Sequence, residues 1–170
     1  MIAATATKSA KQQFVEAFER ETATTIKVLK AYPEDQSELR PQEKMKTARE
    51  LAAMFTMEMA AIDAAVRGTF TFPPKLPPMP QNWKEVVDAF EQTRARTLEG
   101  LREVTDESLA SGSISFPTAP KTVSPWQKLP FAWFLLFDQI HHRGQLSVYL
   151  RLAGGKLPSI YGPTADEPWT

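Results

Sequence analysis

Helical periodicity is the feature that most constrains the fold. Four segments place apolar residues three or four positions apart, and prolines or glycines separate them. This spacing gathers apolar side chains on one face of an α-helix. The predicted helices span about residues 10–31, 41–67 and 82–104, and a fourth runs from Pro125 or Pro130 to the pair Gly154–Gly155. No strand pattern is long enough to predict a sheet, although residues 113–116 could form a short extended piece.

The segment between the second and third helices is rich in proline and runs from Gly68 to Asn82. It cannot be helical, and it is too long for a tight turn between neighbouring helices. A connection of this length can cross the end of a bundle, so that the helices on either side of it run in the same direction. We therefore predict an all-α, four-helix bundle with a long Pro-rich crossover between helices 2 and 3.

Two further apolar features have expected places in this bundle. The aromatic residues Trp133, Phe134 and Phe137 are expected to lie in the core, and a dimer contact is the alternative. The C-terminal tail has no helical period, and it is expected to pack back over the bundle through Ile160, Tyr161 and Trp169.

Composition narrows the function. The 170 residues are expected to form a single domain, residues 1–170, with 20 basic and 20 acidic side chains and no basic stripe, which argues against nucleic-acid binding. No cysteine is present, so disulfides and thiolate catalysis are excluded. The N-terminus lacks the apolar stretch of a signal peptide, and the longest apolar run, residues 129–137, is too short to span a membrane. A soluble, cytoplasmic protein without a membrane partner is expected.

The fourth predicted helix carries both histidines of the chain, His141 and His142. Residues four apart share a helix face, so His142 is aligned with Asp138 before it, and with Gln145 and Tyr149 after it. Asp138 and His142 could supply two ligands to a metal ion. A third ligand would have to come from another helix.

The second helix offers two candidates for that third ligand. Glu58 stands in the middle of its apolar stripe, where an apolar residue is expected, and Met54 precedes it by one turn. The alternative to a metal site is an ionic network, because a buried charge without a partner costs several kcal/mol. In that network Asp138 accepts from Arg94 or His142, and Glu58 takes another of these donors.

The segment FDQIHHRGQLSVYLRLAGGKLPSIYGPTADEPW resembles the C-terminal signature of the DinB-like (damage-inducible) family, and ARELAAMFTMEMAAIDAAVRG resembles its second helix. The resemblance covers nearly the whole chain. It implies a four-helix bundle, commonly a homodimer, that holds zinc or nickel on three residues, one from helix 2 and two from helix 4. Relatives of this fold use bacillithiol or mycothiol in S-transfer or isomerisation.

Carried over by position, His142 matches one of the two helix 4 ligands of the family, and Asp138 occupies the place of the other. The helix 2 position, which is usually histidine, is Met54 here. A thioether is a poor ligand for zinc or nickel, so this departure predicts a degenerate site with weak or no metal binding unless Glu58 completes it.

Three functions are consistent with this pattern. The first is a non-catalytic, stress-related protein that binds a small molecule in a polar cleft between helices 2, 3 and 4. The second is a metal-dependent thiol S-transferase that uses Asp138 and His142. The third is a purely structural module that forms a homodimer.

Overall fold

The computed structural model describes residues 7–75 and 77–169, which fold mainly into helices. Residues 1–6, on which part of the signal-peptide prediction depends, lie outside this range. The long helices are α1 (Ala10–Ala31), α2 (Ala48–Val66), α3 (Trp83–Glu103) and α5 (Lys128–Leu152). The shorter elements are a 3₁₀ turn η1 (Glu34–Gln36), helix α4 (Asp106–Ala110) and strands β1 (Ser113–Ala119) and β2 (Thr122–Gln127). In the described part of the chain, no helix is both long and apolar enough to cross a membrane.

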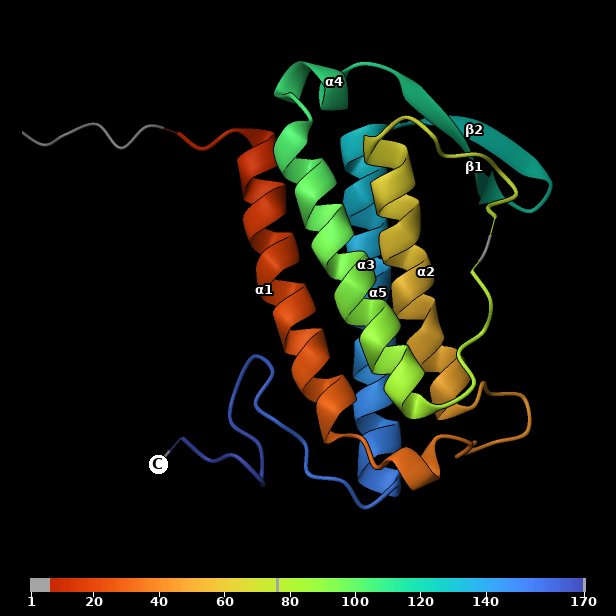
Figure 1. The fold of residues 1–170 in the computed structure, drawn as a ribbon, viewed down its shortest axis with the longest axis vertical. Helices are drawn as coiled ribbons and strands as arrows, with labels where there is room; N and C mark the ends of the chain where they lie inside the picture. The colour runs from red at the N-terminus through yellow and green to blue at the C-terminus, as the bar shows by residue number, and fades with distance from the viewer. Residues whose placement is uncertain (1–6, 76, 170) are drawn as a thin grey trace, which may run out of the picture.

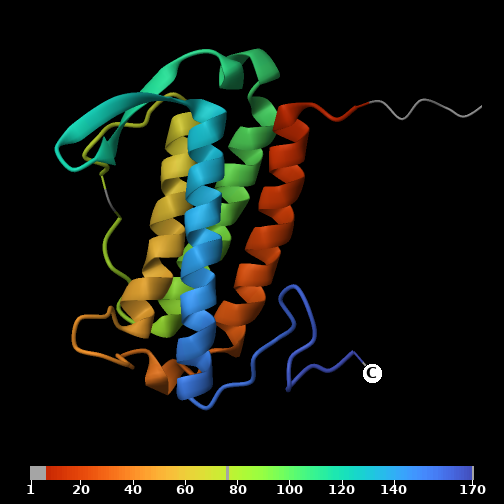
Figure 2. The same ribbon diagram turned by 180° about the vertical axis from the view of Figure 1, so that it is seen from behind.

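The four long helices lie side by side, with α2 packed against α3 and α5, and α1 packed against the same two helices (Figure 1). Helices α2 and α3 run in the same direction, and α1 and α5 run in the opposite one. Seen from behind, α5 lies between α1 and α2 (Figure 2). Their shared core is apolar, and each large side chain fully buried there stabilises the fold by about 1.5–3 kcal/mol. Its fully buried members include Phe14, Phe18, Phe55, Met59, Phe90, Leu101 and Leu136.

Helices α1 and α3 confirm the sequence predictions closely. Helix α1 has the predicted bounds, and Ser9 and Gln12 form a capping box at its start. The side chain of Asn82 accepts a hydrogen bond from the backbone N–H of Glu85, as expected for the residue that caps α3. In both helices, a side chain satisfies backbone donors that the first turn leaves without a partner.

The predicted start of the second helix at Pro41 is wrong. Helix α2 begins at Ala48, after Thr47, whose side chain accepts from the backbone of Glu50 while the Glu50 carboxylate accepts from the backbone N–H of Thr47. Proline suits a first helical turn, but this reciprocal cap satisfies two donors at once and sets the actual start.

The structure also corrects the prediction that no sheet forms. Strands β1 and β2 pair antiparallel as a hairpin, and α5 then begins at Lys128 rather than at Pro125 or Pro130. Pro125 lies within β2, opposite Ser115. Each strand of a two-stranded ribbon has a free edge, so it tolerates a proline that a central strand would reject. The strands were not predicted because Pro125 was taken as a possible helix start and Pro117 as a loop residue.

The aromatic run and the tail are only partly placed as predicted. Phe134 and Phe137 are exposed, with Phe137 60% accessible, so they are not core residues. In the tail, Ile160 packs against the core, but the side chain of Trp169 is exposed and donates only to Ser159. The hydroxyl of Tyr161 reaches partners on α1 and α5.

Candidate metal centre

Three candidate ligands converge between α2 and α5. Helix α2 supplies Glu58, and α5 supplies Asp138 and His142 from successive turns of one face. One ligand atom from each residue lies within 4.8 Å of the other two. The structure thus brings together the two candidates of the fourth predicted helix, which is α5, and the carboxylate that interrupts the apolar stripe of α2.

His142 lies between the two carboxylates. Its Nδ1 is 2.7 Å from Glu58 Oε1, and its Nε2 is 4.0 Å from Asp138 Oδ1. The first contact is a short hydrogen bond. The second is too long for one, so Asp138 is not held by the ring.

The three side chains differ in burial. The side chains of Glu58 and His142 are 7% and 13% exposed, whereas that of Asp138 is 39% exposed. Burial raises the pKa of the Glu58 carboxyl to about 7, although the hydrogen bond with His142 acts in the opposite direction. The same hydrogen bond raises the pKa of the His142 imidazole above its ordinary value. A proton therefore lies between these two groups at neutral pH.

The second carboxylate oxygen of Glu58 is buried and unpaired. No donor in residues 7–75 or 77–169 forms a hydrogen bond with Glu58 Oε2. An acceptor left in this state costs about 1–3 kcal/mol, and more if it is charged. A bound cation or ligand would supply the missing partner.

Arg94 does not join this cluster as the ionic-network alternative expected. Its guanidinium donates to Thr22 Oγ1, 2.8 Å away, and to the backbone carbonyl of Glu19 on α1. The other half of that alternative is present, because Glu58 takes its hydrogen bond from His142. Met54, one turn before Glu58, is partly buried and packs against the hydrophobic core.

The remaining polar residues of the predicted stripe have other partners. Gln145 is exposed and bonds to the ring of His141, 2.9 Å away. The hydroxyl of Tyr149 donates to the backbone carbonyl of Lys46. Neither contact draws these residues into the cluster around His142.

A second buried polar group, which the sequence reasoning missed, centres on Arg143. This side chain is 1% exposed and donates to Glu21 Oε2 at 2.8 Å, to the Glu21 carbonyl at 2.9 Å and to the Tyr161 hydroxyl at 2.7 Å. Burial alone would raise the pKa of Glu21, but the hydrogen bonds from Tyr161 and Arg143 outweigh it and hold that pKa below its usual value. Charged residues at core positions of both helices were the available signal: Glu21 follows Phe18, and Arg143 precedes Leu146, at helical spacing.

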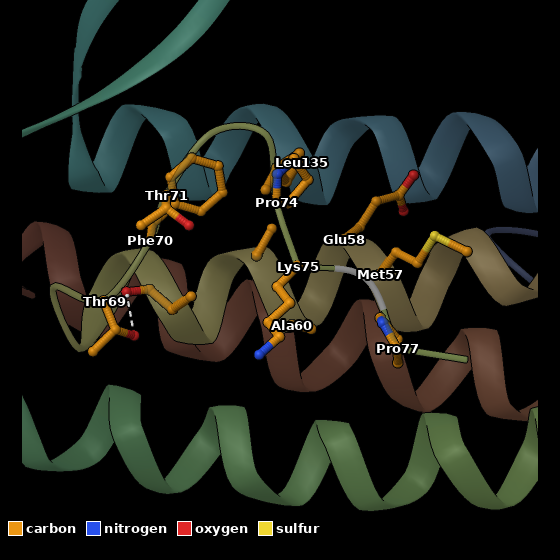
Figure 3. A pocket seen from close by; sticks show the side chains of 12 residues that line it. Met57, Glu58, Ala60, Thr69, Phe70, Thr71, Pro74, Lys75, Pro77 and Leu135 are labelled. Carbon is orange, nitrogen blue, oxygen red and sulfur yellow. Dashed lines mark hydrogen bonds between the residues drawn. The ribbon is translucent and has the colours of Figure 1, made fainter. Parts of the chain in front are cut away.

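A pocket of about 250 Å³ adjoins the candidate metal centre (Figure 3). Glu58 lines it, together with alanines of α2, Leu135 of α5 and part of the segment that follows α2. Most of these residues are apolar, so this pocket differs from the polar cleft between helices 2, 3 and 4 that the sequence suggested.

Comparison with known proteins places the chain in a family. The model of the DinB superfamily matches residues 17–146, a range that includes Glu58, Asp138 and His142. The chain belongs to the DinB superfamily. It is also 25% identical over 157 residues to the uncharacterized protein YrdA of Bacillus subtilis, a match that covers 91% of this chain and 89% of YrdA.

Solved structures of DinB-like proteins share the fold. One from Bacillus cereus superposes with a TM-score of 0.71 at 24% identity, covering 87% of this chain and 95% of the other. YjoA of Bacillus subtilis gives a TM-score of 0.70 at 20% identity, covering 87% of this chain and 97% of the other. At these identities the likeness extends to the helical fold and not to a shared activity.

Proposed function

We propose that this DinB superfamily protein binds a divalent cation through Glu58, Asp138 and His142. The observation that carries the proposal is their convergence within 4.8 Å from two helices. In this view, Glu58 replaces the ligand that the helix 2 position, Met54, fails to provide. In this proposal the centre keeps three ligands, and only the ligand from α2 comes from a different position.

The chemistry of the donors fits such an ion. One imidazole and two carboxylates suit borderline and hard divalent cations, so manganese and iron(II) are candidates beside zinc and nickel. Two ligands of one such ion are roughly 3–4 Å apart, given metal–ligand bonds of about 2.0–2.2 Å. The separations here are close to this range, and the unpaired Glu58 Oε2 offers a further lone pair.

The residues of the chain have distinct roles in this proposal. Glu58 and His142 hold a proton between Oε1 and Nδ1, and cation binding must displace it, so affinity rises with pH. Asp138 is partly exposed and marks the side of the centre that solvent reaches. A bound cation would supply Lewis acidity that lowers the pKa of a thiol or water.

Isothermal titration calorimetry with manganese, nickel and zinc tests the proposal directly. Wild-type protein should bind about one ion, and Glu58→Gln and His142→Ala should each weaken binding at least tenfold. The matched control is Met54→Leu, on the same helix, which should leave the affinity unchanged. No binding at micromolar metal, or unchanged affinity in Glu58→Gln, would overturn the proposal.

Thiol S-transfer is the second candidate function, and the apolar pocket beside Glu58 favours it because it could receive the body of a substrate. It predicts thiol consumption that depends on added metal and on His142.

A purely structural homodimer is the third candidate function. The exposed apolar residues Phe137, Val148 and Leu152 of α5 support it. Sedimentation at several protein concentrations would detect that dimer.

We further propose that the chain is one domain built as a four-helix bundle with a Pro-rich crossover. The shared direction of α2 and α3, and the single core between the long helices, support this description.

A further inference from the structure

The outer face of α5 is apolar, although it lies at the surface. In Figure 2, α5 faces the viewer, and no segment of the described chain crosses its outer side. Four large hydrophobic side chains are exposed there: Phe134 is 39% exposed, Phe137 60%, Val148 57% and Leu152 60%. The exposed face of a surface helix normally carries charged and polar residues. This face is therefore a candidate contact surface.

Helices α1 and α3 show what an exposed helix face of this bundle otherwise carries. Lys27 and Lys30 are exposed on α1, and Arg96 and Glu99 are exposed on α3. These charges keep both faces in contact with water. The outer face of α5 differs from them in kind, because apolar side chains stand where the other two helices place charges.

The exposed residues of α5 form one stripe along the helix. At 3.6 residues per turn they lie within about 40° of one line parallel to the helix axis. We call them the α5 stripe, which consists of Phe134, Phe137, His141, Gln145, Val148 and Leu152. Successive members are three or four residues apart, which is the spacing with which two helices pack along their length. None of the six is an acidic residue, a lysine or an arginine.

The α5 stripe is complementary to itself when two copies run antiparallel. Phe134 then faces Leu152 of the second copy, and Phe137 faces Val148, because both pairs have nearly the same midpoint, close to residue 143. Each pair sets a phenyl ring against an aliphatic side chain. Gly144 lies near that midpoint, and a Cβ added to it would meet nothing within 4 Å, so two helices can approach closely here. Antiparallel helix dipoles also attract each other.

We propose that the α5 stripe joins two copies of this chain, with their α5 helices antiparallel and a two-fold axis near residue 143. In such a dimer each patch meets its own copy, and the absence of charge from the stripe means that no like charges oppose each other. The stripe is about 27 Å long, and one pair of helices buries less than a standard interface does. The dimer should therefore dissociate at micromolar concentrations.

The second copy would also cover the open side of the candidate metal centre. The side chain of Asp138 is 39% exposed and lies beside the α5 stripe, on the same edge of the helix as Gln145. In the antiparallel dimer, Gln145 of the second copy lies on the edge that faces Asp138, and its amide can donate to the carboxylate. This consequence rests on the proposed cation site, whereas the dimer itself does not. The homodimer and cation binding are then compatible rather than alternative functions.

Single cysteines test the antiparallel register, because the chain has no cysteine of its own. Under mild oxidation, a mixture of Phe137→Cys and Val148→Cys proteins should form the mixed disulfide at least tenfold faster than either variant forms a disulfide with itself. Identical positions would lie about 16 Å apart along the helices, which is beyond the reach of a disulfide. Ala95→Cys, at an exposed position of α3, gives the rate of random collision. A mixed disulfide no faster than that control, or no faster than the self-pairs, would overturn the proposal.

A charge placed on the α5 stripe tests the interface itself. Sedimentation from about 1 to 100 µM should show a reversible wild-type dimer, and Val148→Glu should weaken it at least tenfold. Ala95→Glu carries the same charge on α3 and should leave it unchanged. A wild-type monomer at every concentration, or an unchanged dimer in Val148→Glu, would overturn the proposal. Glu58→Gln should weaken metal binding and leave the dimer intact, so the cation site and the dimer can fail separately.

Discussion

Two neighbouring residues of α5, His142 and Arg143, each meet a buried glutamate on a different helix. Arg143 binds Glu21 of α1 and is satisfied on several sides by a carboxylate, a carbonyl and a phenol. His142 binds Glu58 of α2 through one short contact, which leaves Glu58 Oε2 without a donor in the part of the chain that the structure describes. The first group is closed and has the character of a structural link. The second has an unused ligand atom, which is what a binding site requires.

Breaking the closed group should have the largest effect on stability. Arg143→Met keeps the bulk of the side chain but removes the main buried charge that faces Glu21, so it should lower the free energy of unfolding by about 3–5 kcal/mol. Urea denaturation measures this loss.

Arg20→Met is the matched control, because Arg20 also contacts Glu21, at 3.1 Å, but is 68% exposed. Its effect should stay within about 1 kcal/mol. Equal losses in the two variants would mean that burial does not distinguish the two ion pairs.

The pair formed by Glu58 and His142 should instead make the free energy of unfolding depend on pH. The raised pKa of Glu58 means that the folded protein keeps a proton that the unfolded chain has released. The contribution of Glu58 to the stability of the protein is therefore largest below about pH 4.5, and it falls as the pH rises to about 7. The raised pKa of His142 extends the decline in the same direction.

Glu58→Gln removes both causes of this decline, because glutamine does not ionise and His142 loses its carboxylate partner. Between pH 5 and 8, in the presence of a chelator, its stability should rise relative to wild type by an amount on the order of 2 kcal/mol. Denaturant titrations at several pH values measure the difference. Parallel pH profiles for the two proteins would contradict the assignment of a buried, proton-holding Glu58.

The smallest effect concerns the tail. Tyr161→Phe removes a hydroxyl that donates to Glu21 at 2.6 Å and accepts from Arg143, so it should cost about 1–2 kcal/mol in urea denaturation. Trp169→Phe, which removes only an exposed hydrogen bond to Ser159, should cost less than about 0.5 kcal/mol. If both variants match wild type, Tyr161 does not tie the tail to the helices.

The sequence predicted what depends on local pattern. Apolar spacing located α1 and α3, and the carboxylate of Glu58 was noticed because it interrupts an apolar stripe. The hairpin was missed because its prolines were taken as helix starts or loop residues. Pairs such as Arg143 and Glu21 lie 122 positions apart, and their contact depends on how α1 and α5 pack, which no local pattern encodes.

The central claim is that Glu58 completes a cation site with Asp138 and His142. A crystal structure of protein soaked with manganese, with anomalous scattering to locate the ion, tests it most directly. The account predicts one ion coordinated by both carboxylates and by a ring nitrogen of His142, at about 2.0–2.3 Å. An ion held without Glu58, or no ion at this place while the Glu58–His142 hydrogen bond persists, would contradict it.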